Sequence, residues 1–170
     1  MSLRTLHADD RSLLYRLYGD AERMAAIGPA MAPPQIDRLM AERLKPWHPR
    51  ADHWGCWVIE HDGEAMGIVG LRCLPMEQAT AEVGFMLLRR GQGRGLASRG
   101  LNWLCEQADT QWDLDRLVAL SLPDNRRSIG VLQRQGFHLG YRLPKVVPWE
   151  SDFRDGVVYL RDRSAMGTGL

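Results

Sequence analysis

The sequence predicts a mixed α/β fold built on a mostly antiparallel sheet. Short apolar stretches with strand-like alternation follow one another in the first half of the chain, and they indicate a meander of strands. After them, stretches with helical periodicity alternate with further short apolar stretches. The chain has 170 residues, the size of one ordinary domain. We therefore expect a single domain over residues 1–163, and a disordered tail of small and polar residues over 164–170.

The N-terminal third is expected to contribute one strand and two helices. The pattern of residues 3–6 suits a first strand, and an apolar stripe over residues 9–18 predicts a helix. A second helix is expected over residues 35–44. The stretches 28–34 and 45–52 are rich in proline, so both helices should end in irregular loops.

Two pairs of antiparallel strands are expected further along the chain. Residues 57–61 and 65–71 are predicted to form a hairpin, because the Asp62-Gly63 pair between them is typical of a tight turn. Residues 137–143 and 156–160 supply two closing strands, and the segment between them, which contains two prolines and a tryptophan, is expected to be a loop. Most strand pairs should therefore be antiparallel.

The most informative stretch runs from Gln92 to Ala97, between an alternating apolar strand over residues 81–87 and a segment with helical periodicity. Its two glycines, Gly93 and Gly95, let the main chain turn tightly and come close to a ligand. The unpaired N–H groups of the first helical turn lie at the positive end of the helix dipole. This arrangement predicts an anion site suited to a pyrophosphate.

Two common phosphate loops do not fit this stretch. A nucleoside-triphosphate loop requires Lys and then Ser or Thr after its last glycine, whereas Leu96 and Ala97 follow Gly95 here. A dinucleotide fingerprint requires a third glycine or alanine three residues after the second, in the first βαβ unit of the chain. Leu96 occupies that position if Gly91 is taken as the first glycine, and Ser98 if Gly93 is. The stretch also lies in the middle of the chain, not in its first βαβ unit.

What remains is the pattern Gln-x-x-Gly-x-Ala, which resembles the acyl-coenzyme A loop of the GNAT N-acetyltransferase superfamily. The strand before it carries Glu82 ten positions before the glutamine, similar to the acidic residue in the fourth strand of that family. The run Asn125-x-x-Ser128-Ile129, continued by Leu132-x-x-x-Gly136-Phe137, resembles the second half of the superfamily signature. The chain is most similar to the branch of ribosomal-protein N-terminal (alanine) acetyltransferases, and the resemblance spans residues 57–141.

The resemblance implies the GNAT acyl-CoA N-acyltransferase fold, a twisted and mostly antiparallel sheet flanked by helices. It also implies an enzyme that transfers the acetyl group of acetyl-CoA directly to a primary amine. The acceptor stays open between a protein N-terminal α-amine and a small molecule such as a polyamine, an amino acid or an aminoglycoside. A non-catalytic acyl-CoA-binding sensor or assembly module on the same fold is the alternative. Closing strands in this family often meet a partner, so a homodimer is a further expectation.

The resemblance also places the coenzyme along the strand and the loop. The pantetheine arm is expected to pair with backbone groups that follow the acidic residue, and the pyrophosphate with N–H groups of the loop. Gln92 would close the loop, and Arg94 would lie near the phosphates. The main expected role of Asn125 is to cap a helix, and a contact with the coenzyme would be its secondary role. The expected cofactor-binding residues are Met86, Leu87, Leu88, Gln92, Gly93, Arg94, Gly95, Leu96, Ala97 and Asn125. Further candidates for the ribose phosphate, or else ordinary surface residues, are Arg89, Arg90 and Arg126.

Two residues are the candidate catalytic groups. Glu82 occupies the family's acidic position and is expected to take the proton of the amine, directly or through a water; alternation places it opposite Val83. Its alternative role is a structural carboxylate paired with an arginine. Many members place a tyrosine four residues before the Gly-Phe pair to protonate the departing thiolate, but this chain has Leu132 there. Ser128, or a water it holds, is the expected substitute, with Tyr141 a more distant option; Ser128 can instead simply bond the helix backbone.

Composition argues against other partners. The net charge is +1 and the charges are interspersed, so we expect neither nucleic acid nor a membrane surface as a partner. The sequence shows no long apolar run and no signal-peptide core, so a cytoplasmic location is expected. The three widely spaced cysteines suit free thiols. His48, His53 and Cys56 lack a fourth ligand at a familiar zinc spacing, so no metal is expected.

Overall fold

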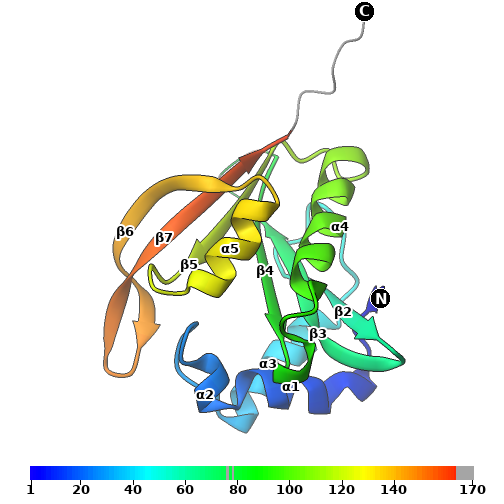
Figure 1. The fold of residues 1–170 in the computed structure, drawn as a ribbon. Helices are drawn as coiled ribbons and strands as arrows, with labels where there is room; N and C mark the ends of the chain where they lie inside the picture. Colours follow the sequence, from blue (N-terminus) through cyan, green and yellow to red (C-terminus); the bar gives the residue numbers. More distant parts are fainter. Residues whose placement is uncertain (76, 78, 164–170) are drawn as a thin grey trace, which may run out of the picture.

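The computed structural model describes residues 1–75, 77 and 79–163, so the tail expected over 164–170 lies outside the described residues. Within them, seven strands form one sheet in the order β1-β2-β3-β4-β5-β7-β6 (Figure 1). All neighbouring strands are antiparallel except β4 and β5, which are parallel. The strands are β1 (Ser2–Thr5), β2 (Gly55–His61), β3 (Glu64–Cys73), β4 (Thr80–Leu87), β5 (Arg116–Ser121), β6 (His138–Trp149) and β7 (Asp152–Asp162). The predicted mixed and mostly antiparallel sheet is confirmed.

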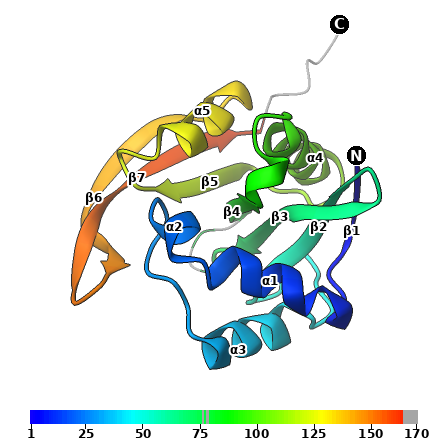
Figure 2. The same ribbon diagram turned by 60° about the horizontal axis from the view of Figure 1, so that its bottom comes forward.

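Helices cover both faces of the sheet. Figure 2 shows α4 and α5 on one face, and α1, α2 and α3 on the other. The helices are α1 (Arg11–Tyr18), α2 (Ala21–Met24), α3 (Pro33–Arg43), α4 (Leu96–Thr110) and α5 (Arg126–Arg134), with short 3-10 turns η1 (Ala8–Asp10) and η2 (Arg89–Gly91). The sequence did not predict α2, because a helix of a single turn is too short to show a periodic apolar pattern.

Each face of the sheet carries its own apolar core, and β4 contributes to both. Ala81 and Val83 belong to the core beneath α4. Met86 belongs to the core that includes Ile36 of α3. Because side chains alternate along a strand, Glu82 lies on the face of Met86, towards α1 and α3 and opposite Val83. The predicted orientation of Glu82 is confirmed.

The sheet splits between β4 and β5. β4 pairs with β3 along its length, but it pairs with β5 only over Thr80–Glu82, opposite Arg116–Val118. Beyond Glu82 the two parallel strands separate (Figure 1). In the described part of the chain, the edge of β4 that faces β5 therefore has no strand beside it after this point, which leaves backbone groups open to a ligand.

Local turn and cap signals are confirmed. Asp62 and Gly63 both have positive φ angles, 53° and 74°, as the tight turn between β2 and β3 requires. At the start of α5, Asn125 Oδ1 accepts a hydrogen bond of 3.2 Å from the N–H of Ser128. After α5, Gly136 has a φ of 81°, the left-handed conformation that ends many helices.

The prediction of a loop between the two closing strands is wrong. Pro144, Pro148 and Trp149 lie within β6, and pairing with β7 continues up to Trp149 opposite Asp152. β6 is an edge strand and its register shifts after Leu143. Prolines lack an N–H donor, and an edge or a bulge is where a sheet tolerates them. The two long strands form one curved hairpin at the side of the molecule (Figure 1).

Candidate active site

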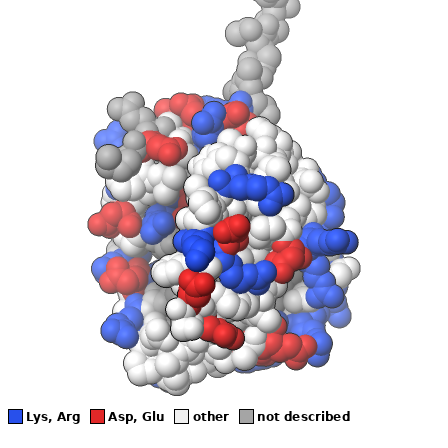
Figure 3. Space-filling view, turned by 90° about the vertical axis from the view of Figure 1, so that its left-hand side faces the viewer, with Lys and Arg blue, Asp and Glu red and all other residues white. Residues whose placement is uncertain are grey.

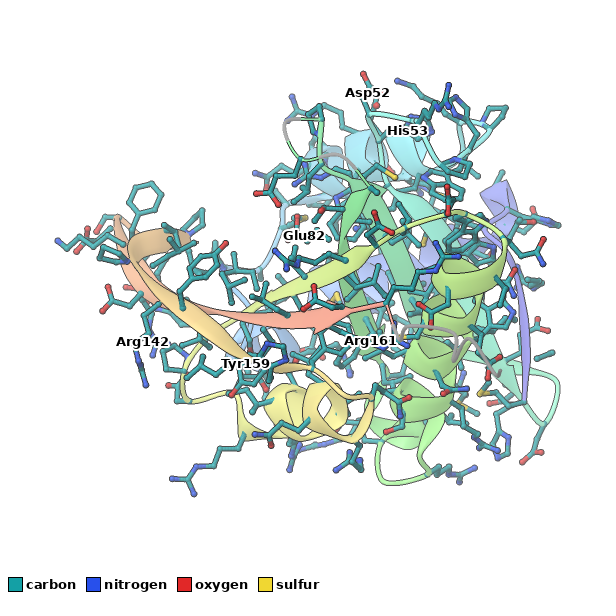
Figure 4. All side chains as sticks on the ribbon, turned by 90° about the horizontal axis from the view of Figure 1, so that it is seen from above. Asp52, His53, Glu82, Arg142, Tyr159 and Arg161 are labelled. Carbon is teal, nitrogen blue, oxygen red and sulfur yellow. The ribbon has the colours of Figure 1, made fainter. Side chains whose placement is uncertain are left out.

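A cleft of about 1220 Å³ opens where β4 and β5 separate. Its walls come from these two strands, from α2 and α5, from the loop and first turn of α4, and from Trp54. Figure 4 shows Glu82 on the side of the sheet that carries His53 and Asp52, with α4 and α5 on the other side. The cleft therefore connects the glycine loop at the start of α4 with the opposite face of the sheet, where the carboxylate of Glu82 lies.

The glycine loop has the backbone geometry expected of an anion site. Gly93 and Gly95 have φ angles of 75° and 70°, and Gly95 is the N-cap of α4. A Cβ atom at either glycine would meet nothing within 4 Å, so it is the backbone conformation that requires glycine here. Gln92 Oε1 accepts a hydrogen bond of 3.1 Å from Arg127 Nη1, which ties the loop to α5. The side chain of Arg94 is exposed beside this loop.

Arginines of α5 surround the same end of the cleft. Arg126, Arg127 and Arg134 line it, and none of them has a carboxylate within ion-pair distance among the described residues. Sequence analysis missed Arg127 and Arg134, although their spacing of seven residues places them on one helix face and was a usable signal. By contrast, Arg89 and Arg90 are exposed, and each forms an ion pair with a glutamate. Arg89 nevertheless lines the cleft, whereas Arg90 does not and is placed as a surface residue.

The β4 edge only partly matches the three expected backbone contacts. The N–H of Leu88 donates to the carbonyl of Met66 at 2.7 Å, and Leu88 is buried and does not line the cleft. Its backbone donor is therefore used inside the sheet. Met86 and Leu87 do line the cleft, and the Leu87 carbonyl accepts a hydrogen bond of 2.9 Å from Arg23 Nη1 of α2. The contact with α2 was not expected from the sequence.

Glu82 lies at the point where the sheet splits. Its Oε2 atom is 2.8 Å from Arg72 Nη2, and its side chain is 23% exposed. The ring of Trp54 covers Gly70 and Gly84 beside it, since a Cβ atom on either glycine would lie 3.5 to 3.6 Å from that ring. Glu82 is thus both paired with an arginine, as in its structural alternative, and accessible from the cleft, as its expected catalytic role requires.

Ser128 and Asn125 face the cleft from the start of α5. Both line it, and the N–H of Ser128 is held by Asn125 Oδ1. The Nδ2 group of Asn125 donates to the Ala26 carbonyl at 3.0 Å, so this side chain links α5 to the segment after α2. Leu132 is 1% exposed, and no acid takes the place of the family's tyrosine there. Tyr141 is 49% exposed on β6 and does not line the cleft.

The remaining aromatic and thiol groups have structural roles. Trp47, Trp57, Trp103 and Trp112 form one cluster with ring centroids 4.9 to 6.0 Å apart, packed against the core beneath α4. Burial raises the pKa of the Cys105 thiol to about 11, as expected of a core residue.

All three cysteines are free thiols. Within residues 1–75, 77 and 79–163, no group of three or more His, Cys, Asp or Glu side chains is arranged to hold a metal ion. None of the helices described is long and apolar enough to cross a membrane. Figure 3 shows acidic and basic side chains interspersed on one face of the molecule.

Comparison with known families decides the class of this protein. Residues 1–138 match the acetyltransferase (GNAT) domain. The chain belongs to the GNAT acetyltransferase family. Its GNAT domain is therefore an acetyltransferase domain, and acetyl-CoA is the acetyl donor of this class of enzyme. An uncharacterized N-acetyltransferase, p20 of Bacillus licheniformis, is 30% identical over 80 residues, which are 47% of this chain and 45% of that protein. The match therefore spans less than half of the length of this relative.

Solved structures share the fold of the GNAT domain at low sequence identity. A spermidine N-acetyltransferase from Vibrio cholerae, in complex with CoA and spermine, has a TM-score of 0.79 and 17% identity, covering 96% of this chain and 95% of its own. A ribosomal-protein-alanine N-acetyltransferase from Brucella melitensis has a TM-score of 0.77 and 20% identity, covering 95% and 99%. RimJ of Mycobacterium smegmatis, in complex with CoA-disulfide, has a TM-score of 0.77 and 21% identity, covering 97% and 83%. These similarities confirm the fold predicted from the sequence.

Proposed function

We propose that the GNAT domain transfers the acetyl group of acetyl-CoA directly to a primary amine that enters the cleft from the side of Glu82. The observation that carries this proposal is one continuous cleft that contains the glycine loop of α4, the open edge of β4 and the carboxylate of Glu82. An anion site, a strand edge and a proton acceptor are the parts that a direct transfer from a thioester to an amine requires.

Acetyl-CoA supplies an activated acetyl group when it is bound. The N–H groups of the first turn of α4 are suited to its pyrophosphate, and the arginines of α5 to its remaining phosphate charge. The open edge of β4 is suited to the amide groups of its pantetheine arm. Because the N–H of Leu88 is used in the sheet, we leave that residue out of the proposed set. The proposed coenzyme-binding residues are Met86, Leu87, Gln92, Gly93, Arg94, Gly95, Leu96 and Ala97, with Asn125 as the cap that orders α5.

The proposed chemistry assigns a proton acceptor and a proton donor. The amine must lose a proton before its nitrogen can attack, and Glu82 accepts that proton directly or through a water. The new N–C bond replaces the C–S bond of the thioester, and the departing sulfur needs a proton. Ser128 lines the cleft and has its N–H engaged by Asn125, which leaves the hydroxyl to donate this proton or to hold a water that does.

The kind of amine is proposed only at the level of its class. Proteins that share this fold include enzymes named for spermidine and for a ribosomal-protein alanine, so a small molecule and a protein N-terminus both stay open. Three free thiols suit a reducing compartment, and we propose the cytoplasm. The homodimer stays a prediction. β6 is an edge strand with exposed Leu139 and Tyr141, so it is the strand at which two copies could pair. Light scattering tests whether they do.

The first test is calorimetry with acetyl-CoA, followed by release of free thiol in the presence of peptides, amino acids, polyamines and aminoglycosides. Binding with thiol release supports the proposal and identifies the acceptor class. Binding without release for every amine favours the alternative, a non-catalytic acyl-CoA sensor. Absence of binding contradicts the role of the glycine loop, and with it the proposed function.

A further inference from the structure

Arg43, the last residue of α3, is a cleft arginine for which the described residues provide no counter-ion. It lines the cleft on the same face of the sheet as Glu82. Within the described residues, no carboxylate lies within ion-pair distance of it, and the residues outside that part carry no Asp or Glu side chain. Arg43 is only partly exposed. Leaving a partly desolvated charge unpaired is costly, so such an arrangement needs a compensating reason.

The groups that touch Arg43 are uncharged. Its guanidinium carbon lies 5.3 Å from the ring centre of Tyr18 and 5.8 Å from that of Trp54, and its Nη1 is 4.0 Å from Cys56 Sγ. Burial raises the pKa of both the Tyr18 hydroxyl and the Cys56 thiol, so both are neutral at physiological pH. The rings hold the guanidinium in place by cation–π contact but cannot neutralise it.

Every carboxylate that lines the cleft within the described residues is already paired. Asp20 lies 3.6 Å from Arg23, Glu22 lies 2.9 Å from Arg89, and Glu82 lies 2.8 Å from Arg72. A polycationic acceptor would therefore find no free negative partner on these walls. Among the described residues that line the cleft, Arg43 and the α5 arginines have no carboxylate partner, and of these Arg43 contacts Trp54.

Trp54 connects Arg43 to the proposed reaction centre. The same tryptophan ring that lies 5.8 Å from the Arg43 guanidinium lies 5.5 Å from the guanidinium of Arg72, the partner of Glu82. An acceptor whose amine reaches Glu82 can therefore extend a second group along Trp54 towards Arg43. A planar guanidinium is suited to a carboxylate, which it binds through two parallel N–H donors.

We propose that the acceptor is an amine that also carries a carboxylate, and that Arg43 binds this carboxylate while the amine lies at Glu82. The proposal rests on the proposed transfer to an amine and narrows its substrate class. Two sources provide this chemistry: a free amino acid, through its α-carboxylate, and a polypeptide N-terminus with Asp or Glu among its first residues. Spermidine, which carries no carboxylate, is predicted to be a poor acceptor.

The test compares matched acceptors on the whole protein. Methionine and phenylalanine are compared with methioninamide and phenylalaninamide, and a peptide beginning Ser-Asp is compared with one beginning Ser-Asn. Thiol release gives kcat/KM, and calorimetry on the protein loaded with CoA gives the affinity for each probe. A lost charge-assisted contact is worth about 10- to 100-fold, so we expect the carboxylate member of at least one pair to be favoured by that factor when kcat/KM is expressed per concentration of neutral amine. The pair that shows the preference identifies the source.

Variants then assign the preference to one side chain. In Arg43→Gln the ratio between the two members of the pair should fall by about 10- to 100-fold from its wild-type value, and Arg43→Lys should keep part of the preference. The two probes differ in amine pKa by the same amount with every protein, so this difference cancels when the ratio of a variant is divided by the ratio of the wild type. Arg38→Gln is the matched control, an exposed arginine of α3 that does not line the cleft, and it should leave the ratio unchanged. Thermal melting of each variant shows that the fold persists.

The outcomes separate this inference from the proposed function. If amines release thiol but neither carboxylate pair shows a preference, or if Arg43→Gln weakens both members equally, the inference is wrong and the transferase stands. A loss of acetyl-CoA affinity in Arg43→Gln would also contradict it, because it would place Arg43 at the coenzyme. If no carboxylate-bearing probe binds the CoA-loaded protein, the inference is wrong; absence of acetyl-CoA binding by the wild type overturns the proposed function itself.

Discussion

Arg72 and Glu82 face each other directly across the β3–β4 pair, and their side chains meet at 2.8 Å at the last point where β4 still has β5 on its other side. Glu82 thus lies on the wall of the cleft, at the point where the two strands separate. An ion pair with side chains 41% and 23% exposed contributes little to stability, about 1 kcal/mol or less. The location of this ion pair therefore suits a role in positioning the carboxylate of Glu82 better than a role in stabilising the fold.

Glu82→Gln is expected to lower kcat by about 100-fold or more while leaving the affinity for acetyl-CoA nearly unchanged, because the amide cannot accept the amine proton. The loss should be largest below the pKa of the acceptor amine and smaller above it, where the amine is already neutral. Thiol release measured across pH tests this. Glu60→Gln is the matched control, a strand glutamate that pairs with Arg4 at 2.7 Å and lies outside the cleft. Unchanged turnover in Glu82→Gln would remove this residue from the mechanism.

Arg72→Gln is expected to lower kcat by a smaller factor, about 10-fold, because it releases the Glu82 carboxylate without removing it. Combined with Glu82→Gln, it should add almost nothing, since the two residues act as a unit. Arg116→Gln breaks a comparable strand ion pair with Asp162, 46% and 54% exposed, away from the cleft, and should leave kcat unchanged. Additive effects of the Arg72 and Glu82 changes would show that Arg72 does not position the carboxylate.

Ser128→Ala tests the proton donor. We expect kcat to fall by about 10-fold or more with little change in stability, since the N–H of this residue, not its hydroxyl, completes the helix cap. Asn125→Ala is the informative comparison, because it removes the cap and should lower the free energy of unfolding by about 1 kcal/mol. If Ser128→Ala keeps full turnover with every acceptor, a water or the coenzyme environment supplies the proton instead.

The sequence predicted those features that are coded over a few neighbouring residues. The Asp62-Gly63 turn, the cap at Asn125 and the loop from Gln92 to Ala97 each depend on local backbone preferences, and all three have the expected conformations. Side-chain alternation alone fixed the face on which Glu82 lies. These are short-range rules that do not depend on the rest of the fold.

What the sequence could not predict depends on contacts between distant segments. The ion pair of Glu82 with Arg72 follows from strand register, which no local pattern specifies. Leu88 was expected at the coenzyme, but its N–H is used by Met66, a consequence of the same register. The lack of a carboxylate beside Arg43 among the described residues also depends on how segments far apart in the sequence are placed. The prolines of β6 led to the prediction of a loop, because proline is disfavoured inside a sheet. It is tolerated in an edge strand, but the local sequence does not show that a strand will lie at the edge.

Asp10→Asn tests the pH dependence of stability at a residue that does not line the cleft. Burial of Asp10 would raise its pKa, but hydrogen bonds from Arg4 and from the N–H of His7 outweigh burial and hold the pKa below its ordinary value. A lowered pKa gives stability that is present at neutral pH and lost as pH falls below about 3.9, the unfolded value. We expect the substitution to cost about 2 kcal/mol at pH 7 by urea unfolding, and less near pH 3. An equal cost at both pH values would contradict this.

Gly95→Val tests the glycine loop. Gly95 has a φ of 70°, a conformation that a β-branched residue strongly disfavours, so the loop should change shape and the N–H groups of α4 should no longer converge. We expect the affinity for acetyl-CoA in calorimetry to fall by about 10-fold or more. Gly63→Val is the matched control, since Gly63 has a φ of 74° and, like Gly95, has open space around its Cβ position, but lies in the β2–β3 turn away from the cleft. Both variants should lose similar stability, and only Gly95→Val should lose coenzyme affinity. Equal affinities would mean that the phosphates are held by the arginines of α5 and not by the backbone of this loop.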